Sequence, residues 1–208
     1  MTEIKILIVE DEPIIAADIE SALEKNEYKD SDIAYSMEDA LHALKNNTPD
    51  LAILDINLSG ALEGIQIAQT IKSNYHLPFV FLTSYSDKST LDQAKHTEPS
   101  GYLVKPFTEP TLFTTIEIAL YNHAQKMKLQ FPELSLPVIN KNLATQQLSQ
   151  REFDLLYLIY NGKTNQRIAD ELFISLNTVK KHINNMYLKL ESSSRGAAIA
   201  RTRQLMMQ

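Results

Sequence analysis

Five short apolar runs are spaced along the first half of the chain. The two clearest are 4–9 (IKILIV) and 51–54 (LAIL). Shorter runs lie at 33–35, 78–83 and 101–105, and segments with helical spacing of apolar residues follow the runs, beginning at Pro13, Ser36, Gly64, Ser86 and Pro110. Apolar strands that alternate with helices are typical of a parallel sheet covered on both faces. The pattern therefore predicts a doubly wound α/β domain with a five-stranded parallel sheet.

Beyond residue 147 the apolar spacing is helical throughout. Four helices are predicted, opening near Ser149, Thr164, Leu176 and Arg195. Ser149 and Glu152 have the spacing of a capping box, and Ser175 is the expected N-cap of the third helix. A short helix, a tight turn and a longer basic helix form the pattern of a helix-turn-helix. The chain is thus expected to end in a small all-α domain, and this pattern alone leaves open whether the domain binds DNA or another protein.

The segment between these halves, 123–146, has no clear period. It mixes charged residues with Pro132 and Pro137, so it is expected to be a helix tail followed by a linker. The predicted domains are then 1–122 and 147–208. Charge divides the chain at the same place: residues 1–122 carry 8 basic and 20 acidic side chains (−12), and residues 123–208 carry 12 and 6 (+6), which together give the net charge of −6. The basic half is the candidate for binding nucleic acid.

Composition excludes several other classes of protein. The chain has no cysteine, so neither a disulfide framework nor a thiolate metal site is expected. No apolar run reaches 18 residues, and the N-terminus enters a strand without the residue order of a signal peptide. We therefore expect a cytoplasmic protein that does not cross a membrane.

Carboxylates follow two of the predicted strands. Glu10 and Asp11 come directly after the first run, and Asp55 ends the third. The carboxyl ends of the strands form the ligand crevice of an open α/β sheet, so these side chains should converge. Clustered carboxylates repel one another unless a cation lies between them, and an all-oxygen set suits Mg2+. The alternative is that the acids merely end strands and start turns, where Asp is common.

Further positions along the first half complete a recognisable set. They are Asn57 two residues after Asp55, Thr83 at the end of the fourth run, and Tyr102-x-x-Lys105-Pro106-Phe107 around the end of the fifth. With these, residues 1–122 resemble the receiver domain of two-component response regulators, which has a flavodoxin-like fold. The resemblance implies a Mg2+ site formed by Glu10 (through water), Asp11, Asp55 and the backbone carbonyl of Asn57.

The resemblance also implies roles in phosphoryl transfer. Asp55 would be the phosphoacceptor, since a carboxylate can attack phosphorus and form an acyl phosphate. Lys105 and Thr83 would contact phosphoryl oxygens and help to offset their charge. Tyr102 would be the switch aromatic that turns inward on phosphorylation. The Lys105-Pro106 bond is expected to be cis, as in other receivers.

The loop after Asp55 departs from the family pattern. Many receivers pass through a Met-Pro segment to a glycine eight residues after the phosphoacceptor, whereas here Gly64 stands nine residues on and the loop has no proline. The departure affects the metal-side geometry and the accessibility of Asp55. A working site is still expected, because all the charged partners are present.

The second half carries a resemblance of its own. Its motifs are Leu148-Ser149-x-Arg151-Glu152, Gly162, Asn165-x-x-Ile168-Ala169-x-x-Leu172, Ile174-Ser175-x-x-Thr178-Val179-Lys180-x-His182-Ile183 and Tyr187-x-Lys189-Leu190. Residues 147–207 resemble the LuxR-type output domain, which favours DNA over a protein partner. The family usually has a glycine and an apolar residue where this chain has Glu191 and Ser192, a difference that concerns dimer packing more than DNA contact.

The resemblance implies that the third helix enters the major groove. Lys180, Lys181 and Asn184 would contact bases, since Lys suits guanine acceptors and Asn suits adenine. Thr178, Lys163 and Lys189 would contact phosphates. His182 is left open between packing against the scaffold and reaching the DNA backbone.

Together these features predict a DNA-binding transcription regulator controlled by phosphorylation of Asp55. A histidine kinase would donate the phosphoryl group, and a homodimer would bind double-stranded DNA at two half-sites about one helical turn apart. One rival is a phosphorylation-independent DNA binder whose receiver is a dimerisation module. Another is a phosphatase that passes through an aspartyl phosphate, although no second Asp stands two residues after Asp55.

Overall fold

The structure is a computed structural model that describes residues 4–25, 28, 30–47, 49–84, 88–129, 131, 133–143 and 146–207. The chain forms two compact units, Ile4–Leu120 and Tyr121–Gln208. Helix α5 (Glu109–Lys128) crosses the division. Each unit is described by itself.

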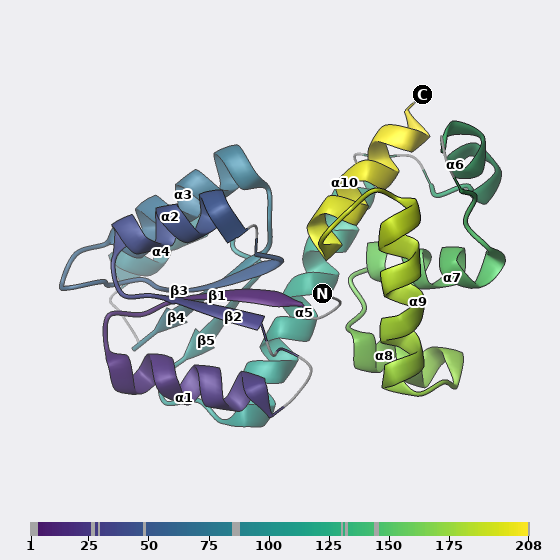
Figure 1. Ribbon diagram of the computed structural model, residues 1–208. Helices are drawn as coiled ribbons and strands as arrows, with labels where there is room; N and C mark the ends of the chain where they lie inside the picture. Colours follow the sequence, from purple (N-terminus) through teal and green to yellow (C-terminus); the bar gives the residue numbers. More distant parts are fainter. Residues whose placement is uncertain are drawn as a thin grey trace. The chain divides into compact units, whose positions relative to one another are not determined.

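The first unit is built on a five-stranded parallel sheet, as predicted (Figure 1). Its strands are β1 (Lys5–Val9), β2 (Asp30–Ala34), β3 (Leu51–Asp55), β4 (Phe79–Thr83) and β5 (Gly101–Val104), in the spatial order β2-β1-β3-β4-β5. The register pairs Val9 with Leu54 and Thr83 with Val104. The carboxyl ends of β1, β3, β4 and β5 therefore meet at one edge of the sheet.

Helices cover both faces of this sheet (Figure 1). They are α1 (Pro13–Glu24), α2 (Met37–Asn47), α3 (Glu63–Thr70) with a π-helical turn η1 (Ile71–Tyr75), α4 (Lys88–His96) and α5. Strand residues alternate between two cores: Ile6 and Ile8 pack with α1 and α5, whereas Leu7 and Val9 pack with α2, α3 and α4. Because neighbouring strand side chains point to opposite faces, apolar runs without polar alternation require this double cover.

The second unit is helical. It contains α6 (Leu136–Asn142), α7 (Gln150–Tyr160), α8 (Asn165–Leu172), α9 (Leu176–Lys189) and α10 (Arg195–Met206). Ser149 closes the predicted capping box with Glu152, and Ser175 caps α9. The α9 residues expected on the inner face are all fully buried, namely Val179, Ile183, Met186 and Leu190. Within the described residues, no helix has the length and apolar character needed to cross a membrane.

Some local predictions differ from the structure. The segment 123–146, expected to be a helix tail and linker, contains α6, whose Ile139 is fully buried in the core of the second unit. Tyr35 lies outside β2, and Ile14, one of the apolar residues whose spacing predicts α1, is 78% exposed. The helix expected over 86–95 is seen from Lys88 as α4, and its first two predicted positions lie outside the described residues.

Candidate functional site: an acidic pocket and a basic helix

Three carboxylates converge at the carboxyl edge of the sheet. Glu10 follows β1, Asp55 ends β3, and both are buried, while Asp11 is half-buried. In the described part of the chain these three residues form one cluster in which one carboxylate oxygen from each lies within 4.8 Å of the others. Parallel register places them together, because Val9 lies beside Leu54. The sequence-based expectation that these acids converge is confirmed.

Lys105 joins two of these carboxylates. Its Nζ lies 2.6 Å from Glu10 Oε2 and 2.5 Å from Asp55 Oδ2. The Lys105 backbone N–H donates to the Thr83 carbonyl at 2.8 Å. This hydrogen bond extends the pairing of β4 with β5 one residue beyond the end of β5. The following Lys105-Pro106 bond is cis, as expected.

The local charge balance shifts two pKa values. Burial raises the pKa of Glu10, the hydrogen bond from Lys105 opposes the rise, and the charge of Asp55 adds to it. Burial alone would lower the pKa of Lys105, but its ion pairs with Asp55 and Glu10 outweigh burial and raise it. Lys105 is therefore a fixed positive charge, while Glu10 holds a proton to higher pH than an ordinary glutamate.

The residues present fit a hard divalent cation. Among the described residues, the Lys105 ammonium pairs with two of the three clustered carboxylates, so the pocket keeps an excess of negative charge. The ligand atoms of the cluster are all carboxylate oxygens, which suit Mg2+ rather than a softer metal. Asn57 completes the expected set at the rim, where its backbone N–H donates to Asp55 Oδ1 at 2.9 Å.

Gly64 fixes the loop that follows Asp55. A Cβ atom at this residue would lie 1.8 Å from the Asp55 carbonyl oxygen, so no side chain fits there. The loop is one residue longer than in many receivers, and its glycine packs directly against the end of β3. The longer loop is absorbed between Asn57 and Gly64.

Thr83, the expected phosphoryl contact, and Tyr102, the expected switch aromatic, lie on neighbouring strands. Thr83 ends β4 and is buried, and the Tyr102 ring on β5 is 36% exposed and tilted against Phe81 at a centroid distance of 5.9 Å. Burial raises the pKa of Tyr102 above the ordinary tyrosine value. Val104, two residues on, is also exposed on the same strand.

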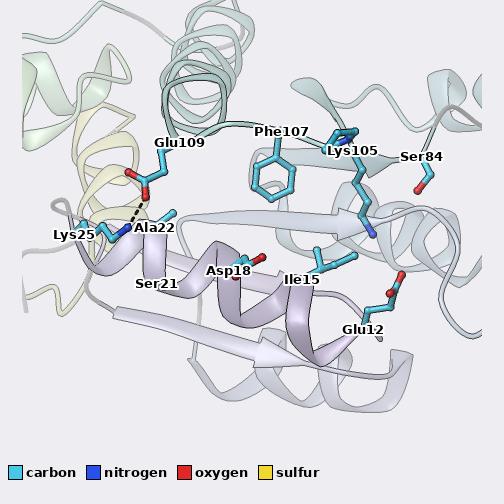
Figure 2. Close-up of a pocket in the computed structure, with 11 residues that line it drawn as sticks. Glu12, Ile15, Asp18, Ser21, Ala22, Lys25, Ser84, Lys105, Phe107 and Glu109 are labelled. Atoms are coloured by element: carbon cyan, nitrogen blue, oxygen red, sulfur yellow. Dashed lines mark hydrogen bonds and ion pairs between the residues drawn. The ribbon is translucent and has the colours of Figure 1, made fainter.

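A cleft of about 560 Å³ ends at Lys105 (Figure 2). Its walls come from α1 and from the segment after β5, with Ile15, Ala22 and Phe107 as apolar lining. Glu12, Asp18 and Glu109 add carboxylates, and Glu109 pairs with Lys25 at 2.5 Å. The cleft thus reaches Lys105 from the side of α1, and Glu10, Asp11 and Asp55 are not among its lining residues.

In the second unit, α9 exposes one polar face. Asn177, Lys181, Asn184 and Leu188 are exposed at steps of four, three and four, and Asn185 is exposed beside them. Of the residues expected to contact DNA, Lys181 and Asn184 lie on this face, while Lys180 and Thr178 are half-buried beside it. Asn177, Asn185 and Leu188 lie on the same exposed face, although the sequence-based set of DNA-contacting residues did not include them.

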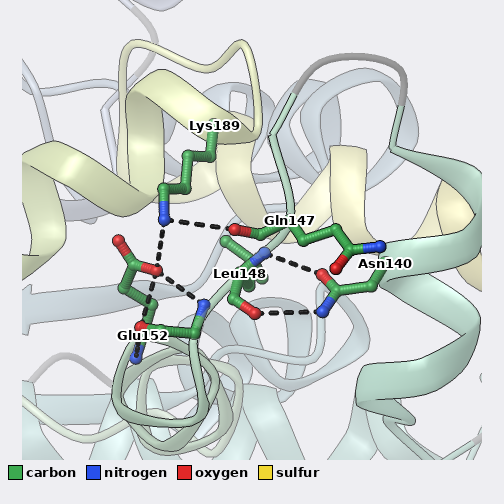
Figure 3. Close-up of polar contacts among 6 residues, drawn as sticks. Asn140, Gln147, Leu148, Glu152 and Lys189 are labelled. Atoms are coloured by element: carbon green, nitrogen blue, oxygen red, sulfur yellow. Dashed lines mark hydrogen bonds and ion pairs between the residues drawn. The ribbon is translucent and has the colours of Figure 1, made fainter.

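Two lysines expected to contact phosphates are engaged within the domain. Lys189 Nζ lies 2.7 Å from Glu152 Oε2 and donates to the Gln147 carbonyl at 3.1 Å (Figure 3). Lys163 pairs with Glu171 at 2.5 Å in a more exposed position. The charge of Lys189 is thus used to hold α9 against the start of α7. No short sequence motif predicts the pairing of Lys189 with Glu152, because the two residues are 37 positions apart in the chain.

Both units match known protein families. Residues 6–117 match the response regulator receiver domain, and residues 146–202 match the bacterial regulatory proteins of the luxR family. The receiver also resembles the solved signal receiver domain of a modulated diguanylate cyclase from Desulfovibrio desulfuricans G20. That structure shares 35% identity, with a TM-score of 0.54, and the match covers 59% of this chain and 97% of that one.

Relatives extend the similarity over most of the chain. The uncharacterized transcriptional regulatory protein YhcZ of Bacillus subtilis (strain 168) is 32% identical over 168 residues, which are 77% of this chain and 76% of the relative. The transcriptional regulatory protein YdfI of the same organism is 25% identical over 205 residues, covering 94% and 93%. These relatives are regulators of transcription rather than enzymes. The chain therefore belongs to the two-component response regulators, with an N-terminal receiver domain and a LuxR-type DNA-binding domain.

Proposed function

We propose that phosphorylation of Asp55, supported by Mg2+, switches this protein between states of low and high affinity for two-fold DNA sites. The observation that carries the proposal is the environment of the Asp55 carboxylate. Oδ1 accepts the Asn57 N–H, Oδ2 accepts Lys105, and two further carboxylates lie within reach of one cation. This arrangement holds a nucleophile beside groups that can offset an incoming negative charge.

The covalent step is a displacement at phosphorus. An Asp55 carboxylate oxygen forms a bond to phosphorus while the bond from phosphorus to the imidazole nitrogen of the kinase phosphohistidine breaks, and the electron pair leaves with the imidazole. Lys105 Nζ, now on Asp55 Oδ2, turns to a phosphoryl oxygen. Glu10, Asp11, Asp55 and the Asn57 carbonyl would hold Mg2+, which supplies further charge neutralisation when bound.

The switch would then run through Thr83 and Tyr102. A phosphoryl group adds about −1.5 to −2 charge and three acceptor oxygens, and the Thr83 hydroxyl donates to one of them. The partly exposed Tyr102 ring turns inward into the space that Thr83 leaves. Phosphorylation thereby biases a two-state equilibrium, and a shift from 1:99 to 99:1 takes about 5.5 kcal/mol of differential stabilisation.

The DNA-binding domain would recognise its DNA site through the exposed face of α9. Lys181 and Asn184 would contact base edges from the major groove, together with Asn177, and Leu188 would contact a thymine methyl group. Lys180 and Thr178 lie beside this face. Lys180 would contact bases at its border, and Thr178 would contact phosphates. Lys163 can reach a phosphate by exchanging its exposed partner Glu171, whereas Lys189 is better assigned to the scaffold. A homodimer would place two such faces on half-sites about one turn apart.

Selection of bound duplexes from a randomised DNA pool tests the proposal. The full chain is used with and without beryllofluoride, which stands in for the phosphoryl group, and Asp55→Ala is the control. We expect a two-fold site that emerges only with beryllofluoride and only when Asp55 is present. The same site under every condition would show that the receiver does not gate DNA binding. No site at all would point to a protein partner for the basic domain.

A further inference from the structure

The loop between β3 and α3 holds Asp11 through a backbone hydrogen bond. The Ser59 N–H donates to Asp11 Oδ2 at 2.8 Å. The donor belongs to a tight reversal in which Leu58 and Ala61 exchange two backbone hydrogen bonds of 3.0 and 2.8 Å. Ser59 and Gly60 have φ values of 49° and 80°, and two central residues in the left-handed region are typical of a type I′ turn. The extra residue of this loop is thus accommodated in a hairpin turn.

Both ends of this hairpin are anchored. On one side Leu58 is fully buried in the core shared with α2, α3 and α4. On the other side Gly64 packs against the Asp55 carbonyl, where no side chain fits. Because neither anchor can shift without opening the core or the strand end, the Ser59 amide is held in place over Asp11.

We propose that Ser59, through its backbone N–H, is a positioning residue that orients Asp11 for cation binding. The proposal rests on the Mg2+ site of the proposed function. A carboxylate offers about four acceptor directions, so Oδ2 can accept the amide while a lone pair remains for the cation that Glu10 and Asp55 share. Outer partners that fix a ligand typically change metal affinity about 10–100-fold. An amide that instead competed with the cation for Asp11 would have the opposite effect.

Calorimetric titration of the full chain with Mg2+ tests the sign of this effect. Ser59→Pro removes the N–H, and Ser59→Gly keeps it while favouring the positive φ. We expect Ser59→Pro to weaken Mg2+ binding about tenfold and Ser59→Gly to bind within about twofold of the wild type. Equal or tighter binding by Ser59→Pro, with receiver amide resonances that show an intact fold, would overturn the proposal.

A second measurement needs no variant, because proline at a left-handed position can also open the turn. Hydrogen exchange of the wild-type Ser59 amide is followed with and without Mg2+. We expect a protected amide in both states, with slower exchange when Mg2+ is bound. Faster exchange with Mg2+ would show that the cation breaks the bond, which overturns the positioning role. Absence of Mg2+ binding by the wild type would overturn the proposed function itself, a result distinct from either outcome for Ser59.

Discussion

The receiver and the DNA-binding domain each contain a buried glutamate paired with a lysine. In the receiver, Lys105 Nζ lies 2.6 Å from Glu10 Oε2, and in the second domain Lys189 Nζ lies 2.7 Å from Glu152 Oε2. Glu10 shares its lysine with Asp55, whereas Glu152 Oε2 accepts from Lys189 and also from the N–H and hydroxyl of Ser149, at 2.7 and 2.8 Å. The two Glu–Lys pairs therefore differ in their surroundings: Glu10 competes with another carboxylate for its lysine, whereas Glu152 has additional hydrogen-bond donors.

The pKa values of the two glutamates report this difference. Burial raises the pKa of Glu10, with Asp55 adding to the rise, and Lys105 does not fully offset it. Burial would also raise the pKa of Glu152, but hydrogen bonds from Lys189 and Ser149 outweigh it and lower the pKa. A carboxylate such as Glu10, whose negative charge is only partly offset, can bind a cation. A carboxylate such as Glu152, whose charge is offset by several hydrogen bonds, stabilises the fold. Glu10, which is proposed to bind Mg2+, thus differs from Glu152 in its local charge balance.

The largest expected effect comes from Asp55→Asn, which removes the phosphoacceptor. The beryllofluoride-dependent gain in DNA affinity should disappear, while the free energy of unfolding without Mg2+ should stay the same or rise, because one of three repelling charges is gone. Anisotropy with a selected duplex and urea denaturation measure the two quantities. Glu152→Gln is the matched control in the other pair, and it should keep the beryllofluoride response. A response retained by Asp55→Asn would contradict the assignment of the site.

Lys189→Met should destabilise the DNA-binding domain. The variant leaves Glu152 buried with fewer donors, at an expected cost of about 1.5–3 kcal/mol in the free energy of unfolding. Urea titration followed by the amide resonances of α7 and α9 measures it, with the exposed Lys181→Met as control. Added Mg2+ should not restore this loss, whereas it should restore part of any loss in Lys105→Met. Equal behaviour of the two lysine variants toward Mg2+ would remove the distinction between the pairs.

The pH dependence of stability should have opposite signs for the two glutamates. Both have an ordinary pKa of 4.5 when unfolded. Because the folded pKa of Glu152 is lower, its stabilising effect is present above pH 4.5 and is lost as pH falls through the folded value. Because the folded pKa of Glu10 is higher, its destabilising effect at neutral pH is relieved as pH falls through that value toward 4.5. Denaturation across a range of pH gives the free energy of unfolding of the wild type, Glu152→Gln and Glu10→Gln. The difference between the wild type and each variant should show these two trends. Parallel trends would refute the charge-balance account.

The smallest expected effect concerns the turn that follows Lys189. Glu191 has a φ of 52° where the family usually has glycine, so Glu191→Gly should relieve about 1 kcal/mol of backbone strain. Its ion pair with Arg201 is long, at 3.9 Å, and exposed, so the loss of that pair costs little. A small rise in the melting temperature of the domain, with unchanged DNA affinity, is the expected result. A fall would show that the glutamate contributes more than its geometry suggests.

Much of this arrangement follows from local patterns in the sequence. Period and length identified the strands and most helices, because burial on one face or two imposes those periods on the chain. Ser149–Glu152 and Ser175 were recognisable as caps because a cap acts over three residues. The convergence of Glu10, Asp11 and Asp55 was also predictable, since parallel strands bring their carboxyl ends to one edge.

Other features depend on contacts between distant residues. Helix α6 is short and begins next to Pro137, so it depends on contacts with residues later in the chain: Ile139 is buried against later helices, and Asn140 and Asn142 hydrogen-bond to Leu148 and Leu205. Lys189 was expected to contact a phosphate because it is a lysine on the basic helix. In the structure it pairs with Glu152 instead, because α9 packs across the start of α7. The Ser59 amide meets Asp11 across 48 residues only because β1 and β3 are neighbours in the sheet. Local sequence specifies the elements and their inward faces, whereas the partner of each polar group is set by the packing of those elements, since hydrogen bonds and ion pairs act over a few ångströms in space regardless of separation along the chain.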